Sequence, residues 1–177
     1  MQVSYTHVLI IIIGSLLFEG CEKDHIVKDG MKPIYIRYDD FSGLKSGPPL
    51  PYQNLGKIVS AGQFIFINEI GKGIHVINNS NPNEPNQIYF WSIVGNTEFT
   101  IFQNVLYANN GKDLLIIDIT NFDNISLSKI IKDQYPLDIL ELYPENYTGY
   151  FECYNYKLGI LKGWEKGELI NPYCKTN

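Results

Sequence analysis

The sequence contains few of the residues that usually carry out catalysis or bind metal ions. Only three histidines and three cysteines occur among its 177 residues. The nucleophile elbow G-x-S-x-G, the zinc motif H-E-x-x-H, the Walker loop and the dinucleotide-binding fingerprint are all absent. The sequence therefore offers no catalytic, cofactor-binding or metal-binding residue. We expect a protein that is not an enzyme and carries no cofactor.

Positive charge is also scarce. Fourteen Lys and Arg residues stand against nineteen Asp and Glu residues, which gives a formal net charge of −5. Without a basic patch there is nothing to neutralise phosphates, so we expect no nucleic-acid partner. A hydrophobic content of 45% with 19% charged residues is typical of a folded chain. Thirteen tyrosines favour strands.

The apolar run over residues 8–18 is too short to cross a bilayer. As a helix it would measure roughly 16 Å, against about 30 Å of hydrocarbon. It has the length of the apolar region of a signal peptide, and Gly20 directly precedes Cys21. This pattern resembles a bacterial lipoprotein signal, although no Lys or Arg precedes the run and Phe18 and Glu19 are unusual there. The alternatives are an ordinary signal peptide or an N-terminal apolar strand.

The lipoprotein resemblance implies that residues 1–20 are removed and that Cys21 carries the lipid. We then expect a protein of the cell envelope, held to the outer membrane by this anchor and facing either the periplasm or the surface. Cys153 and Cys174 would remain as an even pair in an oxidising compartment, which makes them a candidate disulfide. Two buried free thiols are the alternative.

Residues 21–56 are predicted to form a tether with an extended segment. A strand-like stretch, IYIRY, begins at Ile34, and SGPPLP begins at Ser46. Prolines lack a backbone donor and therefore resist pairing within a sheet. We expect this segment to hold the folded domain away from the membrane.

An internal repeat follows the predicted tether. The stretch QFIFINEIGKGIHVINNSNP begins at Gln63, and NVLYANNGKDLLIIDITNF begins at Asn104. The two align at an offset of 41 before the glycine-containing turn and 40 after it, so that Asn68 matches Asn109 and Ile77 matches Ile117. One residue is missing from the second turn, where length is least constrained.

Each repeat also has a strand-like stretch on either side. Four short strands in about forty residues are typical of one propeller blade. The central strands are apolar on both faces, as expected when sheets stack face to face. The sequence thus predicts an all-β fold: two consecutive four-stranded, propeller-blade-like repeats over residues 57–135, a C-terminal β-hairpin that caps them within residues 136–177, and an incomplete propeller.

The stretches FINEIGKGIHVINNSNP and LLIIDITN resemble the LVIVD-repeat family of bacterial envelope lipoproteins. GYFECYNYKLGILKGWEKGE, from Gly149 onward, resembles a stretch that follows such repeats in this family. Family members usually carry further repeats, so the resemblance implies a short or truncated member. Two blades leave a face and an edge uncovered, and an open blade edge is a candidate for self-association.

Several individual residues have two readings. His75 lies between apolar residues, which favours packing or hydrogen bonding over catalysis, and His25 falls in the tether. Neighbouring Asp39 and Asp40 point to opposite faces of a strand and cannot bind one ion together. Asp113 and Asp118 are expected to serve turns. Trp91 and Trp164 are expected to pack in the core, the alternative being a sugar-binding platform.

The function indicated is that of a membrane-anchored envelope lipoprotein whose β-propeller-like repeats form a non-catalytic binding or interaction module. Its partner would be an unidentified protein or a glycan. One alternative is a structural or vestigial fragment of a longer propeller protein. A second is an envelope hydrolase.

Overall fold

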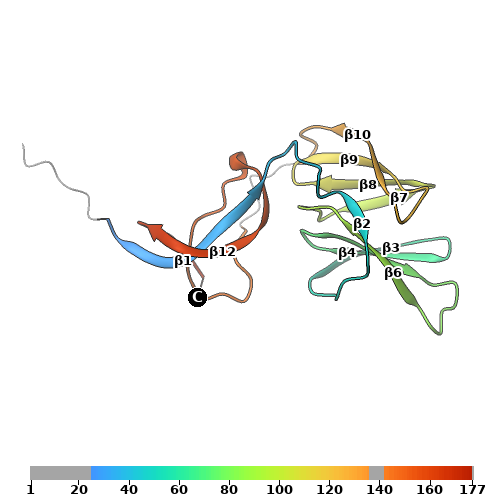
Figure 1. The fold of residues 1–177 in the computed structure, drawn as a ribbon, viewed down its shortest axis with the longest axis horizontal. Helices are drawn as coiled ribbons and strands as arrows, with labels where there is room; N and C mark the ends of the chain where they lie inside the picture. The colour runs from blue at the N-terminus through green and yellow to red at the C-terminus, as the bar shows by residue number, and fades with distance from the viewer. Residues whose placement is uncertain (1–24, 136–141, 177) are drawn as a thin grey trace, which may run out of the picture.

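The computed structural model describes residues 25–135 and 142–176. These residues form three β-sheets, and their one helical element is a short 3-10 turn, η1 (Tyr156–Leu158). Two sheets stack on each other, and the third lies beside them (Figure 1). The predicted all-β fold with incomplete propeller-like blades is confirmed.

The first blade is a five-stranded sheet in the order β2-β6-β5-β4-β3. Four of its strands follow one another along the chain and pair antiparallel with their neighbours. The fifth, β2, is added at the outer edge and comes from the predicted tether. The bounds are β2 (Lys45–Gly47), β3 (Leu55–Ala61), β4 (Phe64–Glu69), β5 (Gly73–Asn78) and β6 (Asn86–Ser92).

The second blade has four antiparallel strands in the order β10-β9-β8-β7. Its bounds are β7 (Phe99–Phe102), β8 (Val105–Asn110), β9 (Asp113–Asp118) and β10 (Ser126–Ile131). Gly71 and Gly111 occupy equivalent turns, and both have positive φ, which glycine adopts without strain. The turn between β8 and β9 is one residue shorter than its counterpart, at the position where the repeat alignment loses a residue.

The hydrophobic core lies between the two blades. Residues paired in register lie on one face of a sheet, so Phe66, Val76 and Tyr89 share the face that meets the second blade. The buried core residues come from both blades: Phe66, Ile74, Val76, Trp91, Ile93, Phe99, Leu106, Ala108, Leu115, Ile117, Ile119 and Ile125. One shared core therefore joins the blades.

Trp91 connects the blades by a directional contact as well. Its Nε1 donates a hydrogen bond of 2.9 Å to the carbonyl oxygen of Phe122, in the loop after β9. The Phe122 ring meets the indole edge-on, with 5.2 Å between centroids. Ser46 Oγ, on β2, donates to the same carbonyl at 2.7 Å. The outer edge of the first blade is thus fixed to the corner of the second.

The third sheet joins both ends of the described chain, in the order β12-β1-β11-β13. Its strands are β1 (Val27–Ile36), β11 (Gly149–Phe151), β12 (Ile160–Ile170) and β13 (Cys174–Thr176). Strand β1 pairs antiparallel with β12 along its whole length and parallel with β11. The third sheet is visible in blue and red in Figure 1.

This sheet corrects two expectations. Residues 21–56 are not a tether throughout, because β1 and β2 are paired strands. The C-terminal segment also differs from the expected hairpin, since β11 and β12 both pair with β1 and not with each other. These partners are distant in sequence, and the pattern of neighbouring strands carries no signal for them. Residues 37–44 and the proline-rich residues 48–54 lie outside strands, as expected for a connecting segment.

The third sheet touches the blades where their turns meet. Ile160, at the start of β12, packs on Gly95 and Gly111, both of which have positive φ. A Cβ at Gly95 would come within 2.5 Å of Ile160 Cγ2. Tyr38 adds a hydrogen bond of 2.7 Å to the carbonyl of Tyr156. The close approach of the third sheet therefore requires glycine at position 95.

Replacing Trp91 by alanine is expected to destabilise the protein by about 3–5 kcal/mol, because the indole is fully buried between the blades. Chemical denaturation followed by circular dichroism measures the loss. Phe102→Ala is the matched control, since that ring is 66% exposed, and its cost should stay below 1 kcal/mol by the usual range for surface substitutions. Equal losses in the two variants would contradict a shared core centred on Trp91.

Candidate functional site

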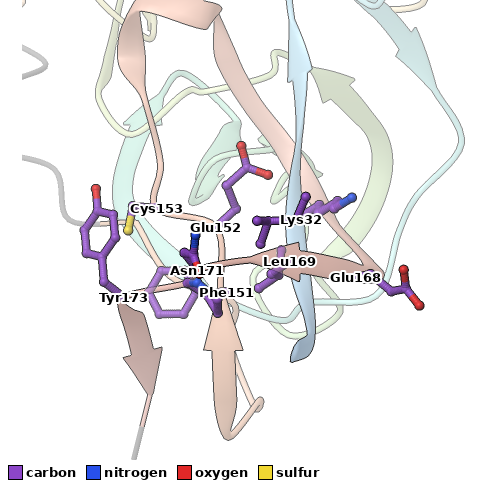
Figure 2. Close-up of a pocket in the computed structure, with 10 residues that line it drawn as sticks. Lys32, Phe151, Glu152, Cys153, Glu168, Leu169, Asn171 and Tyr173 are labelled. Atoms are coloured by element: carbon purple, nitrogen blue, oxygen red, sulfur yellow. The ribbon is translucent and has the colours of Figure 1, made fainter. Parts of the chain in front are cut away.

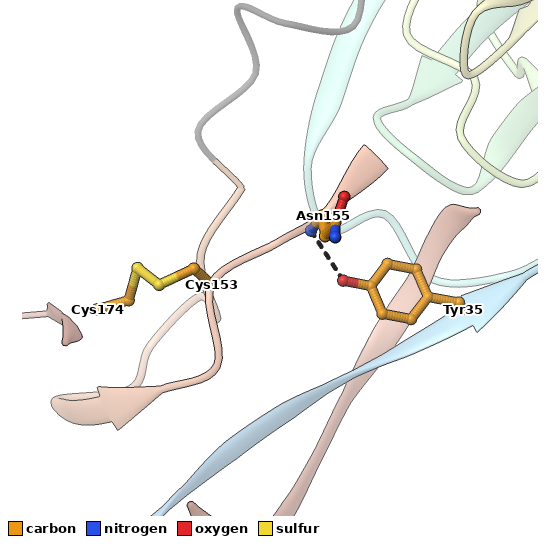
Figure 3. Close-up of a disulfide and its surroundings, with 4 residues drawn as sticks. All are labelled: Tyr35, Cys153, Asn155 and Cys174. Atoms are coloured by element: carbon orange, nitrogen blue, oxygen red, sulfur yellow. Dashed lines mark hydrogen bonds between the residues drawn. A yellow bond between two sulfur atoms is a disulfide. The ribbon is translucent and has the colours of Figure 1, made fainter. Parts of the chain in front are cut away.

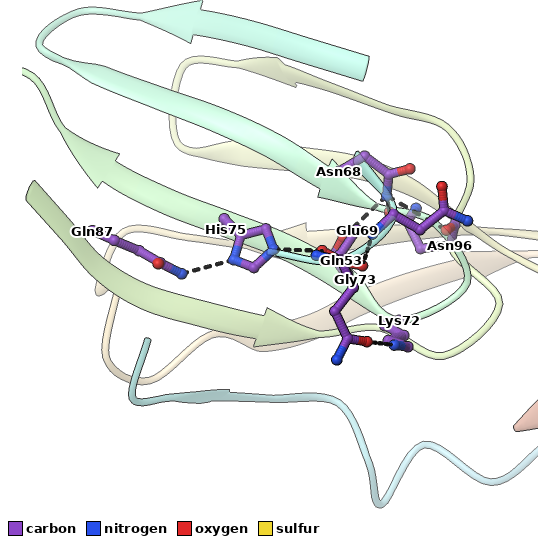
Figure 4. A network of polar contacts seen from close by, with 9 residues as sticks. Gln53, Asn68, Glu69, Lys72, Gly73, His75, Gln87 and Asn96 are labelled. Carbon is purple, nitrogen blue, oxygen red and sulfur yellow. Dashed lines mark hydrogen bonds and ion pairs between the residues drawn. The ribbon is translucent and has the colours of Figure 1, made fainter. Parts of the chain in front are cut away.

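His75 is the one described histidine inside a blade. It lies on β5 and is fully buried, between the rings of Tyr52 and Phe90 at centroid distances of 4.6 Å and 4.9 Å. Its Nε2 is 2.9 Å from Glu69 Oε2, and its Nδ1 is 2.7 Å from Gln87 Nε2 (Figure 4). A ring with its proton on Nε2 donates to the carboxylate and accepts from the amide, so both nitrogens are satisfied.

The carboxylate of Glu69, at the end of β4, accepts hydrogen bonds from three donors. Besides His75, the backbone N–H groups of Gln53 and Asn54 donate to its two oxygens at 3.1 Å and 2.6 Å. Burial by itself raises the pKa of Glu69, but the hydrogen bonds from His75, Asn54 and Gln53 outweigh it and hold the pKa below the ordinary value. Because these backbone groups belong to the segment before β3, the carboxylate fastens that segment to the blade.

Gln53, Glu69 and His75 line a cavity of about 210 Å³, together with Leu50, Pro51, Lys72 and Phe90. A general base needs a free nitrogen within hydrogen-bond reach of a substrate. Here each imidazole nitrogen already faces a protein partner. The arrangement agrees with the expected packed, hydrogen-bonded histidine. Together with Glu69, His75 forms a clamp, which here means that the pair holds residues 50–54 against the first blade.

The buried asparagines of the repeat form a second polar network, which the sequence did not assign. Asn68 Nδ2 donates to Asn96 Oδ1 at 2.6 Å and to the carbonyl of Gly73 at 3.0 Å. Asn96 Nδ2 in turn donates to the carbonyl of Glu98 and to Asn109 Oδ1. The match of Asn68 with Asn109 in the repeat was the available signal. The network satisfies backbone groups where the blades meet.

The two tryptophans differ in their burial. Trp91 is fully buried, as expected for packing. Trp164 is half-buried on β12 and meets Phe151 edge-on, with 5.6 Å between centroids. A sugar ring needs one exposed aromatic face, and the Trp91 indole offers none.

The aspartates serve turns and ion pairs. Asp39 forms an exposed pair with Arg37 at 2.6 Å, and Asp118 accepts a bond from Thr120 N. Asp113 is buried, where Lys132 Nζ and Asp133 N donate to it at 2.7 Å and 3.0 Å. Within residues 25–135 and 142–176, no three His, Cys, Asp or Glu side chains are grouped so that they could hold a metal ion.

A disulfide joins Cys153, in the loop after β11, to Cys174 on β13, with 5.5 Å between their Cα atoms (Figure 3). In the chain-entropy estimate, a crosslink closing such a loop contributes about 3 kcal/mol. Beside it, Asn155 N donates to Tyr35 Oη on β1 at 2.9 Å. The C-terminal strands are therefore fastened to each other and to β1.

A cavity of about 360 Å³ lies beside this disulfide, between β12 and the loops around residues 152 and 172 (Figure 2). Its charged groups are Lys32, Glu152 and Glu168, and the ring of Tyr173 at its edge is 85% exposed. The two glutamates and Tyr173 are exposed side chains. Solvent satisfies such groups, so they give the cavity no fixed pattern of donors and acceptors.

The sheet faces turned away from the shared core are also apolar. The first outer face belongs to the first blade and comprises Ile58, Ile65, Ile67, His75 and Ile77. The second outer face belongs to the second blade and comprises Tyr107, Leu114, Ile116 and Ile131. Ile58 is 63% exposed, and the four residues of the second outer face are half-buried. In Figure 1 the third sheet lies beside the blades and not across either outer face.

The predicted lipid-attachment residue, Cys21, lies outside the described residues. In the part of the chain that the structure describes, no helix has the length and apolar character needed to cross a membrane. Comparison with known protein families, curated proteins and solved structures finds no match for this chain.

Replacing Glu69 by glutamine is expected to cost about 1–3 kcal/mol at pH 7, because charge-assisted hydrogen bonds are lost. A carboxyl group with a depressed pKa stabilises the fold above its unfolded pKa, near 4.5, and this stability is lost as the pH falls through the folded value. The variant should therefore lose less stability than the wild type between pH 7 and pH 3, measured by urea denaturation.

The exposed residue Glu84, in the turn before β6, provides the control. Glu84→Gln should leave both the stability at pH 7 and its dependence on pH unchanged. An unchanged acid response in Glu69→Gln would show that this carboxylate does not hold residues 53 and 54.

Proposed function

We propose that this protein is a lipid-anchored lipoprotein of the cell envelope, and that its blades act as a non-catalytic binding module. The first part of the proposal is supported by the apolar run over residues 8–18, the small residue Gly20 and the cysteine that follows it. A disulfide between the two remaining cysteines fits an oxidising compartment. The LVIVD-like repeats fit the same class of envelope protein.

The binding role is supported by the two outer faces of the blades. In a soluble protein, an extended apolar patch on the surface commonly marks an interaction site. Here each blade buries one face in the shared core and leaves apolar side chains partly exposed on the other. The observation that carries the proposal is this half-buried apolar surface on sheets that pack well on their opposite sides.

Anchoring is tested by growing cells with labelled palmitate. The full chain should incorporate the label, and Cys21→Ala should abolish incorporation because the thiol that carries the lipid is gone. Cys153→Ala is the control: it removes a cysteine of the disulfide and should leave the label in place. Labelling of Cys21→Ala at the wild-type level would contradict the anchor.

Binding is tested by placing a photo-crosslinking amino acid at Ile116 or Ile58 of the full chain in intact cells. Adducts with a protein or glycan are expected at both positions, because the outer faces are the surfaces in contact with a partner. The same probe at Ile170, an exposed apolar residue of the third sheet, is the control. A pattern identical to that control would refute a binding role for the blades.

A further inference from the structure

We propose that the second outer face of one copy binds the first outer face of another copy, head to tail, in the same arrangement that joins the two blades within the chain. The inference rests on the proposed binding role of the blades and names the partner. It is argued from the repeat itself, because the two outer faces are the sequence equivalents of the two faces that already pack together.

The second outer face is equivalent, in the repeat, to the inner face of the first blade, which packs on the second blade. In the repeat alignment, Phe66, Ile74 and Val76 of the first blade match Tyr107, Leu114 and Ile116 of the second blade. The first set is buried against the second blade. The second set occupies the same strand positions, with the same orientation in the sheet, and has no strand of the described residues packed across it in Figure 1.

The first outer face is equivalent, in the repeat, to the inner face of the second blade, on which the first blade packs. Ile65, Ile67 and Ile77 become Leu106, Ala108 and Ile117 of the second blade. Those three residues are fully buried against the first blade. Among the described residues, each blade thus has an outer face on which no other sheet packs, and the shared core shows that faces of these two kinds are complementary.

Charge supports the head-to-tail arrangement. Lys57 on β3 and Glu98, next to β7, are equivalent residues of the repeat, and they form an ion pair of 3.2 Å between the blades. Continuing the stack places Glu98 of one copy beside Lys57 of the next. The same opposite charges then meet at every blade junction. Stacking two identical outer faces gives no such pairing.

The segment over His75 is compatible with this docking. Tyr52 and Leu50 cover the His75 end of the first outer face. The equivalent of His75 in the second blade is Leu115, which lines a small cavity together with Phe41 and Leu44. A segment beside this strand position thus coexists with a docked blade within the chain, and on the first outer face Ile58 remains 63% exposed.

A head-to-tail interface either closes into a ring or continues as an open filament. Propellers contain roughly four to eight blades, so roughly two to four copies of a two-blade chain would close one ring. Several chains would then supply the blades that one longer chain supplies in an ordinary propeller.

The test uses the full chain in nonionic detergent, at fewer than one chain per micelle, with two distinguishable tags. Wild-type chains should co-purify. Ile116→Glu disrupts the second outer face and Ile67→Glu the first, so each variant alone should associate at least tenfold more weakly. Mixed together, the two variants should recover a dimer, because one intact face of each kind remains. Ile170→Glu, in the third sheet, should behave as wild type.

Because a buried glutamate could unfold a blade, a second variant uses surface charges only. The double substitution Lys57→Glu with Glu98→Lys keeps the ion pair within the chain. It should associate with itself and mix several-fold less with wild type, since like charges meet at the new junction. Thermal melting verifies that each variant is folded.

Failure of the two face variants to rescue each other, or equal mixing of the charge-reversed chain with wild type, would overturn the head-to-tail interface. A wild-type chain that stays monomeric but forms adducts at Ile116 with another protein would also overturn it. That last outcome would leave the proposed binding role standing, so the two proposals can fail separately.

Discussion

The fold depends on the face-to-face packing of its two blades, centred on Trp91. Each central strand is apolar on both faces, but when only two sheets stack on each other, each of them buries one face in the shared core. The shared core satisfies the inner faces, and the bond from Trp91 to the Phe122 carbonyl fixes their relative position. The outer faces are apolar like the inner faces, but no second blade packs on them among the described residues. The apolar surface proposed as a binding site is thus a direct result of building a protein from repeated sheets.

The blades were predictable from sequence because their pairing is local. Strand positions, the glycine turns and the residue missing from the second turn all agree with the structure. The third sheet was not predictable, because β1 pairs with strands at the far end of the chain and its own pattern of residues names no partner. Pro33 lies opposite Trp164 in this sheet, although proline has no backbone donor for a strand partner.

Among the polar groups, too, some roles could be predicted from the sequence and others depend on contacts made only in the folded structure. The sequence favoured a packed role for His75, and the structure gives it one, but the partner Glu69 and the clamp on residues 53 and 54 depend on tertiary geometry. Likewise, the match of Asn68 with Asn109 was visible in the repeat, whereas their link through Asn96 was not. Asn96 precedes β7 and has no distinguishing context in the sequence. One polar network therefore fastens a segment to the outer face of the first blade, and the other lies where the two blades meet.

The pairing of β1 with β12 also constrains the order in which the molecule can form. Strand β1 is separated from its partner β12 by most of the chain, whereas every strand of the two blades except β2 pairs with a strand next to it in sequence. Local contacts form faster than distant ones, so the blades should assemble first and the terminal sheet last. Until β12 pairs with it, β1 is an unpaired strand edge that must be kept from aggregating.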